Sequence, residues 1–432
     1  MTLEKNTFIT SLFESLKNEA YVLLKWLGED LSNLPEGSDL DILVEAETAK
    51  KIAIFIETYD LVSKSVKAVR AGTIHYFLYF QNGDFLQIDL LFQLVRKQWT
   101  YLDRKELFDK AIEVKGIKTC PPALVFNHVL LFNFLNYSGL PQKYFQYFST
   151  WTLPQQTQLL QQFNQRYGTN FQNLLATLDF DKKERRLIAN TLSSQINNTY
   201  TQKLQNGFKY LRSVGKQLMG KRGKIITFSG VDGAGKSTII QDILYLLGSK
   251  YRERVIVLRH RPSLLPILSA WKYGKKEAEQ KSMESLPRQG NNNNKITSFF
   301  RFSYYFLDYF FGQFYIWAKY LLRGYTVLYD RYYFDFIIDG KRSNINLPAV
   351  IPQKLYPFIA KPQLNFFLYA DVSTILQRKR ELNPKDITSL TNQYQTLFQE
   401  LGKKHEGAYI PIENIYRQDT IQTIINHYLK IV

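Results

Sequence analysis

The chain has 432 residues, is 45% hydrophobic and 15% aromatic, and carries a formal net charge of +18 at pH 7. This length exceeds what one ordinary hydrophobic core supports, so we expect two or three domains. The positive charge would attract nucleotides, nucleic acid, anionic membranes or charged saccharides without choosing among them. No nucleic-acid-binding module is recognisable, which disfavours nucleic acid as the partner.

The first residues and the cysteine content favour a cytoplasmic protein. Glu4, Lys5 and Glu14 interrupt the region where a secretory signal has its apolar run. The single cysteine, Cys120, cannot form an intramolecular disulfide and belongs to no cluster of metal ligands. This pattern is typical of a reducing compartment, and we expect the thiol to be buried and inert.

From Tyr21 to about Val114, apolar strands alternate with short helices. The predicted strands are residues 39–44, 75–80 and 85–92. Asp39 and Asp41 are two residues apart, so the period of a strand places both carboxylates on one face. Asp89 lies between apolar residues of a neighbouring strand, where its charge needs a partner. Three such carboxylates can hold two Mg²⁺ ions, one activating a hydroxyl and one steadying a triphosphate.

The string GSDLD at residues 37–41 resembles the core signature of polymerase-β-like nucleotidyltransferases, a small residue pair before two aspartates on a strand. The resemblance implies an α+β nucleotidyltransferase-like domain over residues 1–118. Gly37 and Ser38 would let phosphates approach the backbone. Asp39, Asp41 and Asp89 would be its catalytic metal ligands. A degenerate binding module without activity is the alternative.

Residues 119–218 are predicted to form a helical connector or extension, rich in Gln, Asn, Leu and aromatic residues. Its string PALVFNHVLLFNFL, with the earlier YVLLKWL, resembles an uncharacterised bacterial subgroup of the same superfamily. His128 lies at apolar spacing within this helix, and we interpret it as a core histidine and not a ligand. The sequence suggests no Ser-His-Asp or Cys-His catalytic arrangement. It also lacks the spacing of Cys and His residues that is typical of zinc ligands.

Beyond residue 219, strands and helices alternate to the end of the chain, which predicts an α/β domain with a doubly wound parallel sheet over residues 219–432. The predicted strands are residues 224–228, 255–258, 326–329 and 364–368. The polar, Asn-rich stretch Lys272–Lys295 is expected to be an inserted loop. Residues 299–322 are strongly aromatic, but charged residues interrupt them below membrane-spanning length, which favours a buried helix against the sheet.

A phosphate-binding loop follows the first of these strands. Gly230 is followed after four residues by Gly235, Lys236 and Ser237, between an apolar strand and a helical pattern. Glycines let backbone N–H groups turn toward phosphate oxygens, and the next helix presents its positive end. Lys236 would hold the β- and γ-phosphates of ATP, and Ser237 would ligate Mg²⁺. The predicted nucleotide-binding residues are Gly230, Asp232, Gly233, Ala234, Gly235, Lys236, Ser237 and Thr238.

The longer string GVDGAGKST, followed by VLYDRYYFD, resembles the thymidylate kinase family over about half the chain. The later string KPQLNFFLYADVSTILQRKREL resembles that family's fourth strand and the start of its arginine-bearing lid. The resemblance implies that Asp330 acts near Mg²⁺ and the acceptor, that Arg331 grips the acceptor phosphate, and that Asp232 lies near the acceptor sugar. Ala234 replaces a loop arginine of some family members. The catalytic cation would then come from the lid, as Arg378 or Arg380.

Two departures from the family leave the acceptor open. Residues 259–262 read Arg-His-Arg-Pro in place of Arg-Glu-Pro, and the Ser and Gln that follow Asp-Arg in the family are missing. The strings HRPSLLP, DRYYFDFIIDGKR and QRKREL resemble a divergent thymidylate-kinase-like group found with bacterial polysaccharide biosynthesis enzymes. His260 and Arg261 could bind an anionic acceptor, or could form a solvent-exposed basic strand end.

The sequence therefore predicts a bifunctional, ATP- and Mg²⁺-dependent enzyme. Its C-terminal kinase would phosphorylate a nucleotide or saccharide-type acceptor, and its N-terminal domain would be nucleotidyltransferase-like. One rival interpretation is a non-catalytic ATP switch or scaffold. A second rival is membrane-surface or nucleic-acid binding by the basic, aromatic segment Phe299–Tyr325.

Overall fold

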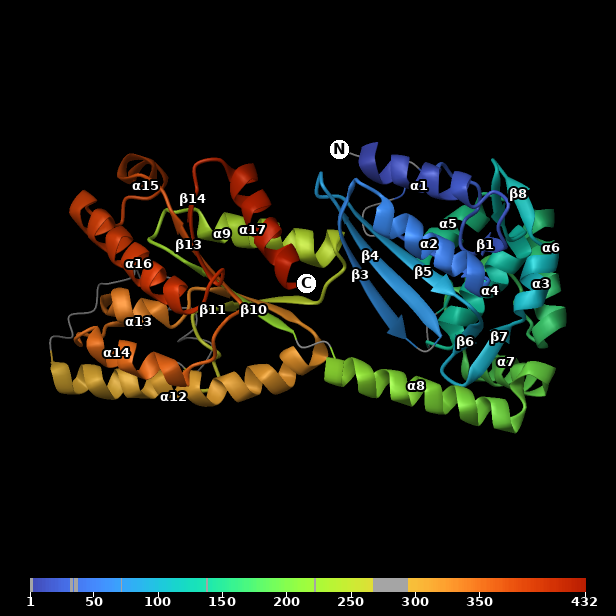
Figure 1. Cartoon of the computed structure of the whole chain (residues 1–432). Helices are drawn as coiled ribbons and strands as arrows, with labels where there is room; N and C mark the ends of the chain where they lie inside the picture. Colours follow the sequence, from blue (N-terminus) through green and yellow to red (C-terminus); the bar gives the residue numbers. More distant parts are fainter. Residues whose placement is uncertain are drawn as a thin grey trace. The chain divides into compact units, whose positions relative to one another are not determined.

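The computed structural model describes residues 3–31, 34, 38–70, 72–136, 139–220, 223–266 and 294–432. The chain divides into two compact units, Met1–Gln217 and Leu218–Val432 (Figure 1). Gly37 and nearly all of the predicted insertion Lys272–Lys295 lie outside the described residues, so those two predictions are not addressed by the structure.

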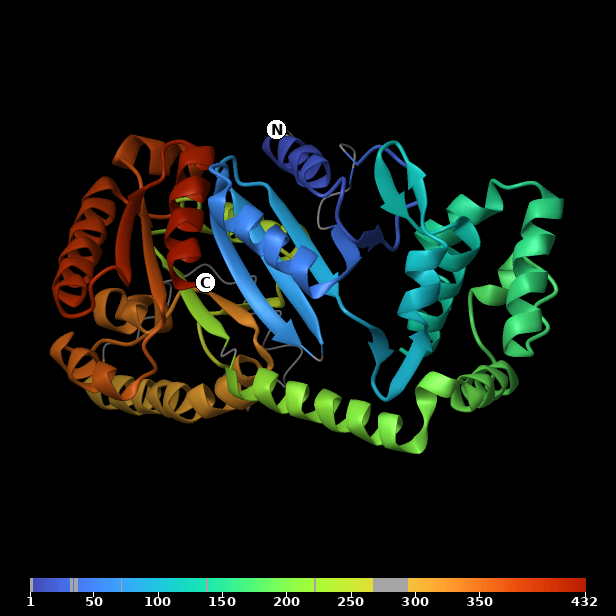
Figure 2. The same ribbon diagram turned by 45° about the vertical axis from the view of Figure 1, so that its right-hand side comes forward.

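The first unit is built on a seven-stranded sheet with the order β3-β4-β5-β2-β1-β9-β8 (Figure 2). Its strands are β1 (Tyr21–Leu23), β2 (Asp39–Val44), β3 (Val62–Arg70), β4 (Thr73–Phe80), β5 (Phe85–Leu91), β8 (Ile112–Val114) and β9 (Ile117–Thr119). Strands β2 and β5 run parallel with Asp41 opposite Asp89, whereas β4 pairs antiparallel with β5. This register brings the three predicted carboxylates together.

The two faces of β2 have different neighbours because its side chains alternate. Leu40, Ile42 and Val44 pack in a core with Phe8 of helix α1 (Leu3–Ser15) and Ile52 of helix α2 (Ala46–Thr58). The other face carries Asp39, Asp41 and Leu43, and Leu43 is buried in a second core with the helices that follow. The carboxylates therefore point toward the helical part of the unit.

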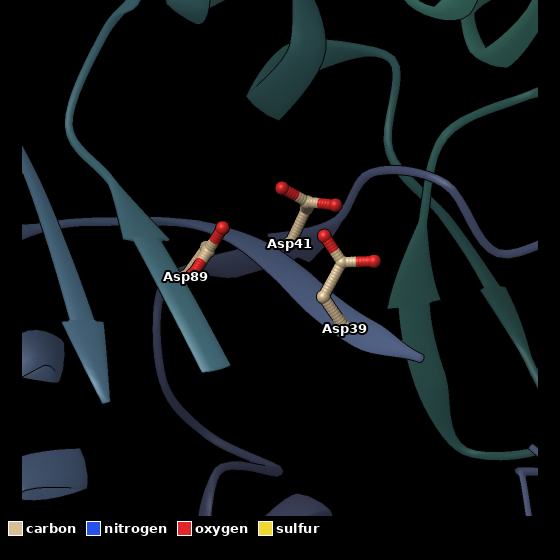
Figure 3. Close-up of side chains that lie close together, drawn as sticks. All are labelled: Asp39, Asp41 and Asp89. Atoms are coloured by element: carbon tan, nitrogen blue, oxygen red, sulfur yellow. The ribbon is translucent and has the colours of Figure 1, made fainter. Parts of the chain in front are cut away.

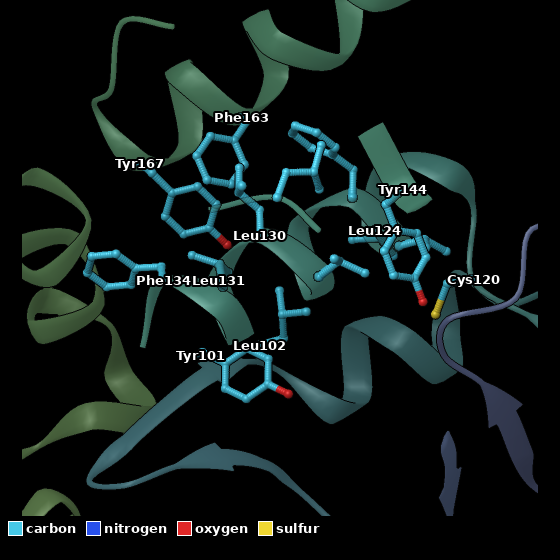
Figure 4. Close-up of a cluster of buried hydrophobic side chains, with 14 of the residues drawn as sticks. Tyr101, Leu102, Cys120, Leu124, Leu130, Leu131, Phe134, Tyr144, Phe163 and Tyr167 are labelled. Atoms are coloured by element: carbon cyan, nitrogen blue, oxygen red, sulfur yellow. The ribbon is translucent and has the colours of Figure 1, made fainter. Parts of the chain in front are cut away.

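In the helical part, α4 is almost fully buried, and its residues Leu124, Leu130 and Leu131 belong to the cluster of buried side chains in Figure 4. A small two-stranded sheet of β6 (Leu94–Arg96) and β7 (Trp99–Leu102) belongs to the helical part. The helices of this part are α3 (Arg104–Asp109), α4 (Pro122–Phe134), α5 (Gln142–Ser149), α6 (Leu153–Tyr167), α7 (Lys182–Ser194) and α8 (Tyr200–Gly220). His128 of α4 is 2% exposed, as its apolar spacing predicted. Cys120 is also buried, and burial raises the pKa of its thiol to about 12.

The second unit has a five-stranded sheet with the order β11-β12-β10-β13-β14, and all of its neighbouring strands are parallel. The strands are β10 (Lys224–Ser229), β11 (Val255–Arg259), β12 (Thr326–Asp330), β13 (Leu364–Tyr369) and β14 (Tyr409–Glu413). The helices are α9 (Lys236–Tyr245), α12 (Lys295–Lys319), α13 (Phe334–Ile338), α14 (Val350–Leu355), α15 (Val372–Arg378), α16 (Pro384–Lys404) and α17 (Arg417–Ile431). This mixed α/β arrangement with a parallel sheet confirms that part of the fold prediction.

The aromatic segment forms helix α12, which has one buried and one exposed side. Phe302, Tyr309 and Ile316 are buried in the core of the second unit, as expected for a helix that packs on the sheet. Phe300 and Phe314 of the same helix are 68% and 58% exposed. Among the described residues, no helix is long and apolar enough to cross a membrane.

Candidate active sites

The predicted phosphate-binding loop connects β10 to α9. The backbone conformation of this loop and its close neighbours call for glycine at three positions. Gly230, Gly233 and Gly235 have φ values of 144°, 89° and 85°, a region that side chains disfavour. A Cβ atom at Gly230 would lie 2.2 Å from the Leu368 carbonyl oxygen. A Cβ atom at Gly235 would lie 2.4 Å from the Asn414 side chain. The loop thus winds tightly between β13 and the segment after β14.

Lys236 lies inside the turn of this loop. Its Nζ donates hydrogen bonds of 2.9 Å to the carbonyl oxygens of Gly230 and Val231, and the residue is only 6% exposed. Burial, together with the charge of Arg331, lowers the pKa of Lys236 to about 7. The two carbonyl groups stabilise the buried ammonium only in part, because they carry no net charge. A bound phosphate group would supply the missing negative charge. Ser237 and Thr238 are exposed in the first turn of α9.

Asp330 and Arg331 lie beside the loop, because Asp330 pairs with Phe228 of β10. Arg331 has a φ of 75°, a costly conformation for an arginine. Its guanidinium donates to Asp232 of the loop at 2.6 Å and to Asp335 at 2.9 Å. These contacts hold the cation at the carboxyl end of β12, where parallel sheets bind ligands.

One carboxylate oxygen of Asp330 is buried and accepts no hydrogen bond from the described residues. Such an atom is costly unless a cation or a hydroxyl donor reaches it. Together with the Ser237 hydroxyl, it offers the oxygen ligands that Mg²⁺ prefers, so these residues fit the predicted ion. The negative charge of Asp330 also acts on Lys236. It raises the pKa of Lys236, but burial and the charge of Arg331 lower that pKa by more.

Arg331 and Asp232 are held in place by residues that no sequence pattern had indicated as part of the site. Arg342 forms an ion pair with Asp232, which also pairs with Arg331. Burial alone would raise the pKa of Asp232, but the neighbouring positive charges keep it well below its usual range. Asp335 is 1% exposed and accepts a 2.7 Å hydrogen bond from the Tyr394 hydroxyl. The spacing of Arg331 and Asp335, four residues apart, was the available sequence signal.

The two predicted lid arginines differ in position. Arg378 donates to the backbone oxygen of Asn414 at 3.4–3.5 Å, next to the loop. The Asn414 side chain in turn donates to the carbonyl oxygen of Ala234 at 2.8 Å and accepts from Thr420. Arg380 is exposed beyond the end of α15, and no contact with the loop is present in the described structure. Only Arg378 is therefore brought to the phosphate-binding loop.

Arg261 does not form the solvent-exposed basic strand end that was one of its two interpretations. It is 8% exposed and pairs at 2.9 Å with Asp308, which is fully buried in α12. Binding of an anionic acceptor by Arg261 stays a prediction. His260 has a φ of 56° and lies beside the Phe336 ring. Burial lowers the pKa of His260 to about 4, so it is neutral at pH 7.

In the first unit, Asp39, Asp41 and Asp89 point toward one another from β2 and β5 (Figure 3). One oxygen from each carboxylate lies within 4.8 Å of the others, a geometry that fits a metal ion with oxygen ligands. Burial and the two other carboxylates raise the pKa of Asp41 to about 6, although Lys25 opposes this. Ser38 precedes β2 and is partly buried.

Polar side chains orient the third carboxylate. His75 Nδ1 and Gln87 Nε2 lie 2.7 and 2.8 Å from one oxygen of Asp89. Lys25 contacts Asp41 and lies 3.8 Å from Asp39. The cluster is therefore preorganised by neighbours on β4, β5 and the segment after β1, and Lys25 is a member that sequence reasoning did not identify.

The second unit thus combines a parallel α/β sheet with the predicted phosphate-binding loop at the end of its central strand, consistent with a P-loop kinase-like fold. Thymidylate kinase from Candida albicans is similar at 17% identity and a TM-score of 0.31, over 48% of this chain and 92% of that one. Thymidylate kinase from Ehrlichia chaffeensis is similar at 16% identity and a TM-score of 0.31, over 48% of this chain and 99% of that one. No protein-family model matches the chain.

Proposed function

We propose that the second unit is an ATP-dependent phosphotransferase of thymidylate kinase type, acting on a nucleoside monophosphate or a saccharide-type acceptor. The observation that carries the proposal is the convergence of Lys236, Asp330 and Arg331 at one end of the parallel sheet. Phosphoryl transfer needs charge neutralisation and in-line placement, which these three groups can supply.

The loop residues would act first on ATP. Backbone N–H groups at the start of α9 and the Lys236 ammonium would hold the β- and γ-phosphates, and Lys236 would exchange its two carbonyl contacts for phosphate oxygens. Mg²⁺, held by Ser237 and Asp330, would neutralise charge on the transferred group. Arg378, which already lies beside the loop, would supply a further cation on the side of α15.

The acceptor would be aligned by the opposite side of the site. Arg331 is fixed between Asp232 and Asp335 and would bind an anionic group of the acceptor. The buried carboxylate oxygen of Asp330 would ligate Mg²⁺ when the attacking atom is a phosphate oxygen of a nucleoside monophosphate. With a saccharide-type acceptor, the same oxygen would instead accept a hydrogen bond from the attacking hydroxyl. The resemblance of several strings to a group linked with bacterial polysaccharide biosynthesis supports a saccharide-type acceptor as one of the two classes to test.

The test is transfer of labelled γ-phosphate from ATP with Mg²⁺ to dTMP, to other nucleoside monophosphates and to a saccharide extract. Lys236→Ala should abolish transfer, and Lys385→Ala, at an exposed position of α16, is the matched control. Transfer to dTMP identifies a thymidylate kinase, and transfer only to saccharide material identifies the divergent activity. Tight ATP binding with no transfer to any acceptor contradicts the proposal and favours the switch.

We further propose that the first unit is a Mg²⁺-dependent nucleotidyltransferase, supported by the three convergent carboxylates. Pyrophosphate release from nucleoside triphosphates should require Asp39 and Asp41 together. If the double variant Asp39→Ala, Asp41→Ala retains the full activity of the unit, the cluster is not catalytic.

A further inference from the structure

Lys25 lies within the carboxylate cluster of the first unit. It follows β1, which pairs antiparallel with β2, and the backbone N–H of Leu24 donates to the Asp41 carbonyl oxygen at 2.9 Å. This pairing brings the Lys25 side chain level with the two aspartates of β2. Its ammonium contacts the Asp41 carboxylate and lies 3.8 Å from that of Asp39.

The surroundings of Lys25 hold its ammonium there. The Phe132 ring of α4 lies 5.6 Å from Nζ, a cation–π distance, and the Tyr144 hydroxyl reaches the Lys25 backbone oxygen at 3.5 Å. The Lys25 side chain is 24% exposed and that of Asp41 is 9% exposed. An ammonium in this position has the electrostatic effect of a bound cation, because it separates two carboxylates that would otherwise repel.

The charge balance gives this contact a consequence for metal binding. Among the groups whose contacts with these carboxylates are described, Lys25 contributes one positive charge against three negative ones when His75 is neutral. The difference of two charges equals the charge of one divalent ion. Two divalent ions would instead leave the cluster and Lys25 with excess positive charge, unless phosphates entered with the second ion. Lys25 and a second divalent ion therefore compete for the same carboxylates.

We propose that Lys25 fills the second cation position of the cluster when no nucleotide is bound, and turns to the nucleotide phosphates when the second divalent ion arrives. The first half concerns the carboxylate cluster alone, and the second half rests on the proposed nucleotidyltransferase function. The nucleotide-free protein should accordingly bind one divalent ion at this cluster, and loss of the Lys25 charge should open a second position.

The test is Mn²⁺ binding to the full-length, nucleotide-free protein, measured by electron paramagnetic resonance of free Mn²⁺. The wild type and Lys25→Arg should bind one ion at the cluster, and Lys25→Met should bind two or should bind the first at least about tenfold more tightly. Lys51→Met is the matched control, because it removes a lysine of the same unit from its surface ion pair with Glu19. Circular dichroism reports whether each variant is folded.

The outcomes separate this inference from the proposed function. Equal Mn²⁺ stoichiometry and affinity in the wild type and in folded Lys25→Met overturn the role of Lys25, whatever the activity of the unit. Absence of Mn²⁺ binding in both proteins, with no difference from Asp39→Asn, Asp41→Asn, overturns the metal site itself and with it the nucleotidyltransferase proposal. If Lys25→Met does not fold, Lys25→Gln takes its place in the same comparison.

Discussion

At the scale of single residues, buried charge pairs orient side chains of the second unit, and the pair of Asp335 with Arg331 is one of them. Asp335 is 1% exposed, accepts from Tyr394 and pairs with Arg331 at 2.9 Å. The charge of Arg331 keeps the pKa of Asp335 below its usual value although burial opposes this. A buried carboxylate with these partners holds the guanidinium in one orientation.

We predict that Asp335→Asn lowers phosphoryl transfer by about tenfold or more while ATP affinity changes little, because a neutral amide would hold Arg331 less firmly and leave the loop intact. Breaking this buried pair should also cost about 3–5 kcal/mol of unfolding free energy. Kinetics with varied acceptor and urea denaturation test both effects. Asp419→Asn, exposed in α17, is the control, and equal behaviour of the two variants would contradict the role of Asp335.

His128 gives the first unit a dependence on pH. Burial, with a smaller effect of Lys25, lowers the pKa of His128 in the folded protein to about 3, and Nε2 has no hydrogen-bond partner among the described residues. Below about pH 6.5 the unfolded chain binds a proton at this residue that the folded chain does not. Acid therefore favours unfolding, by up to about 1.4 kcal/mol per pH unit between roughly pH 6 and 4.

The prediction is that His128→Leu removes this part of the pH dependence, because leucine suits the apolar core around α4. Urea denaturation of both proteins at several values of pH measures the slope. His405→Leu, at an exposed position, should leave it unchanged. A His128→Leu variant with the wild-type slope would show that other groups cause the acid sensitivity.

At the scale of elements, α12 shows how one helix serves two environments. Phe302 is 1% exposed in the core, and Phe300, two residues earlier, is 68% exposed. We predict that Phe302→Ala lowers the free energy of unfolding by about 3–5 kcal/mol. Phe300→Ala should change it by less than about 0.5 kcal/mol. Thermal denaturation of this pair tests the orientation of the helix, and similar losses in both variants would contradict it.

The elements predicted correctly from the sequence are those with a local signal. The loop from Gly230 to Ser237 was recognisable because its glycines, lysine and hydroxyl residue stand between a strand and a helix. The strands missed by the prediction include β3 and β14, which lie at the edges of their sheets. Strand β14 contains Pro411, a residue that sequence patterns rarely place in a strand. In β3 every second residue is exposed and most of these are polar, so neither strand has the apolar run of a central strand.

The site residues missed by the prediction depend on contacts across long stretches of sequence. Arg342 reaches Asp232 across 110 residues, and Asn414 reaches Ala234 across 180 residues. Lys25 lies in an ordinary apolar strand pattern, and only the pairing of β1 with β2 reveals its place beside Asp41. A single sequence carries no signal for such contacts, whereas the period of a strand was enough for Asp39 and Asp41.

At the scale of the whole molecule, each unit has its own hydrophobic core. Val22 and Leu43 from the sheet of the first unit share a core with Phe126 and Phe163 from its helices. The main core of the second unit joins α12 to strands β10, β12 and β13. The units should therefore unfold as separate cooperative transitions.

The last prediction uses these two transitions to assign ligands to units. ATP with Mg²⁺ at about 100 times its dissociation constant should stabilise a unit that binds it by about 2.7 kcal/mol. For units of this size, that stabilisation raises the midpoint by roughly 5–10 °C in differential scanning calorimetry. Lys236→Ala should remove the ATP-induced shift of the second unit's transition and leave that of the first unit unchanged. The double variant Asp39→Asn, Asp41→Asn should remove the shift of the first unit's transition and leave that of the second unchanged. A single transition, or one shift lost in both variants, would mean that the two sites do not act in independent units.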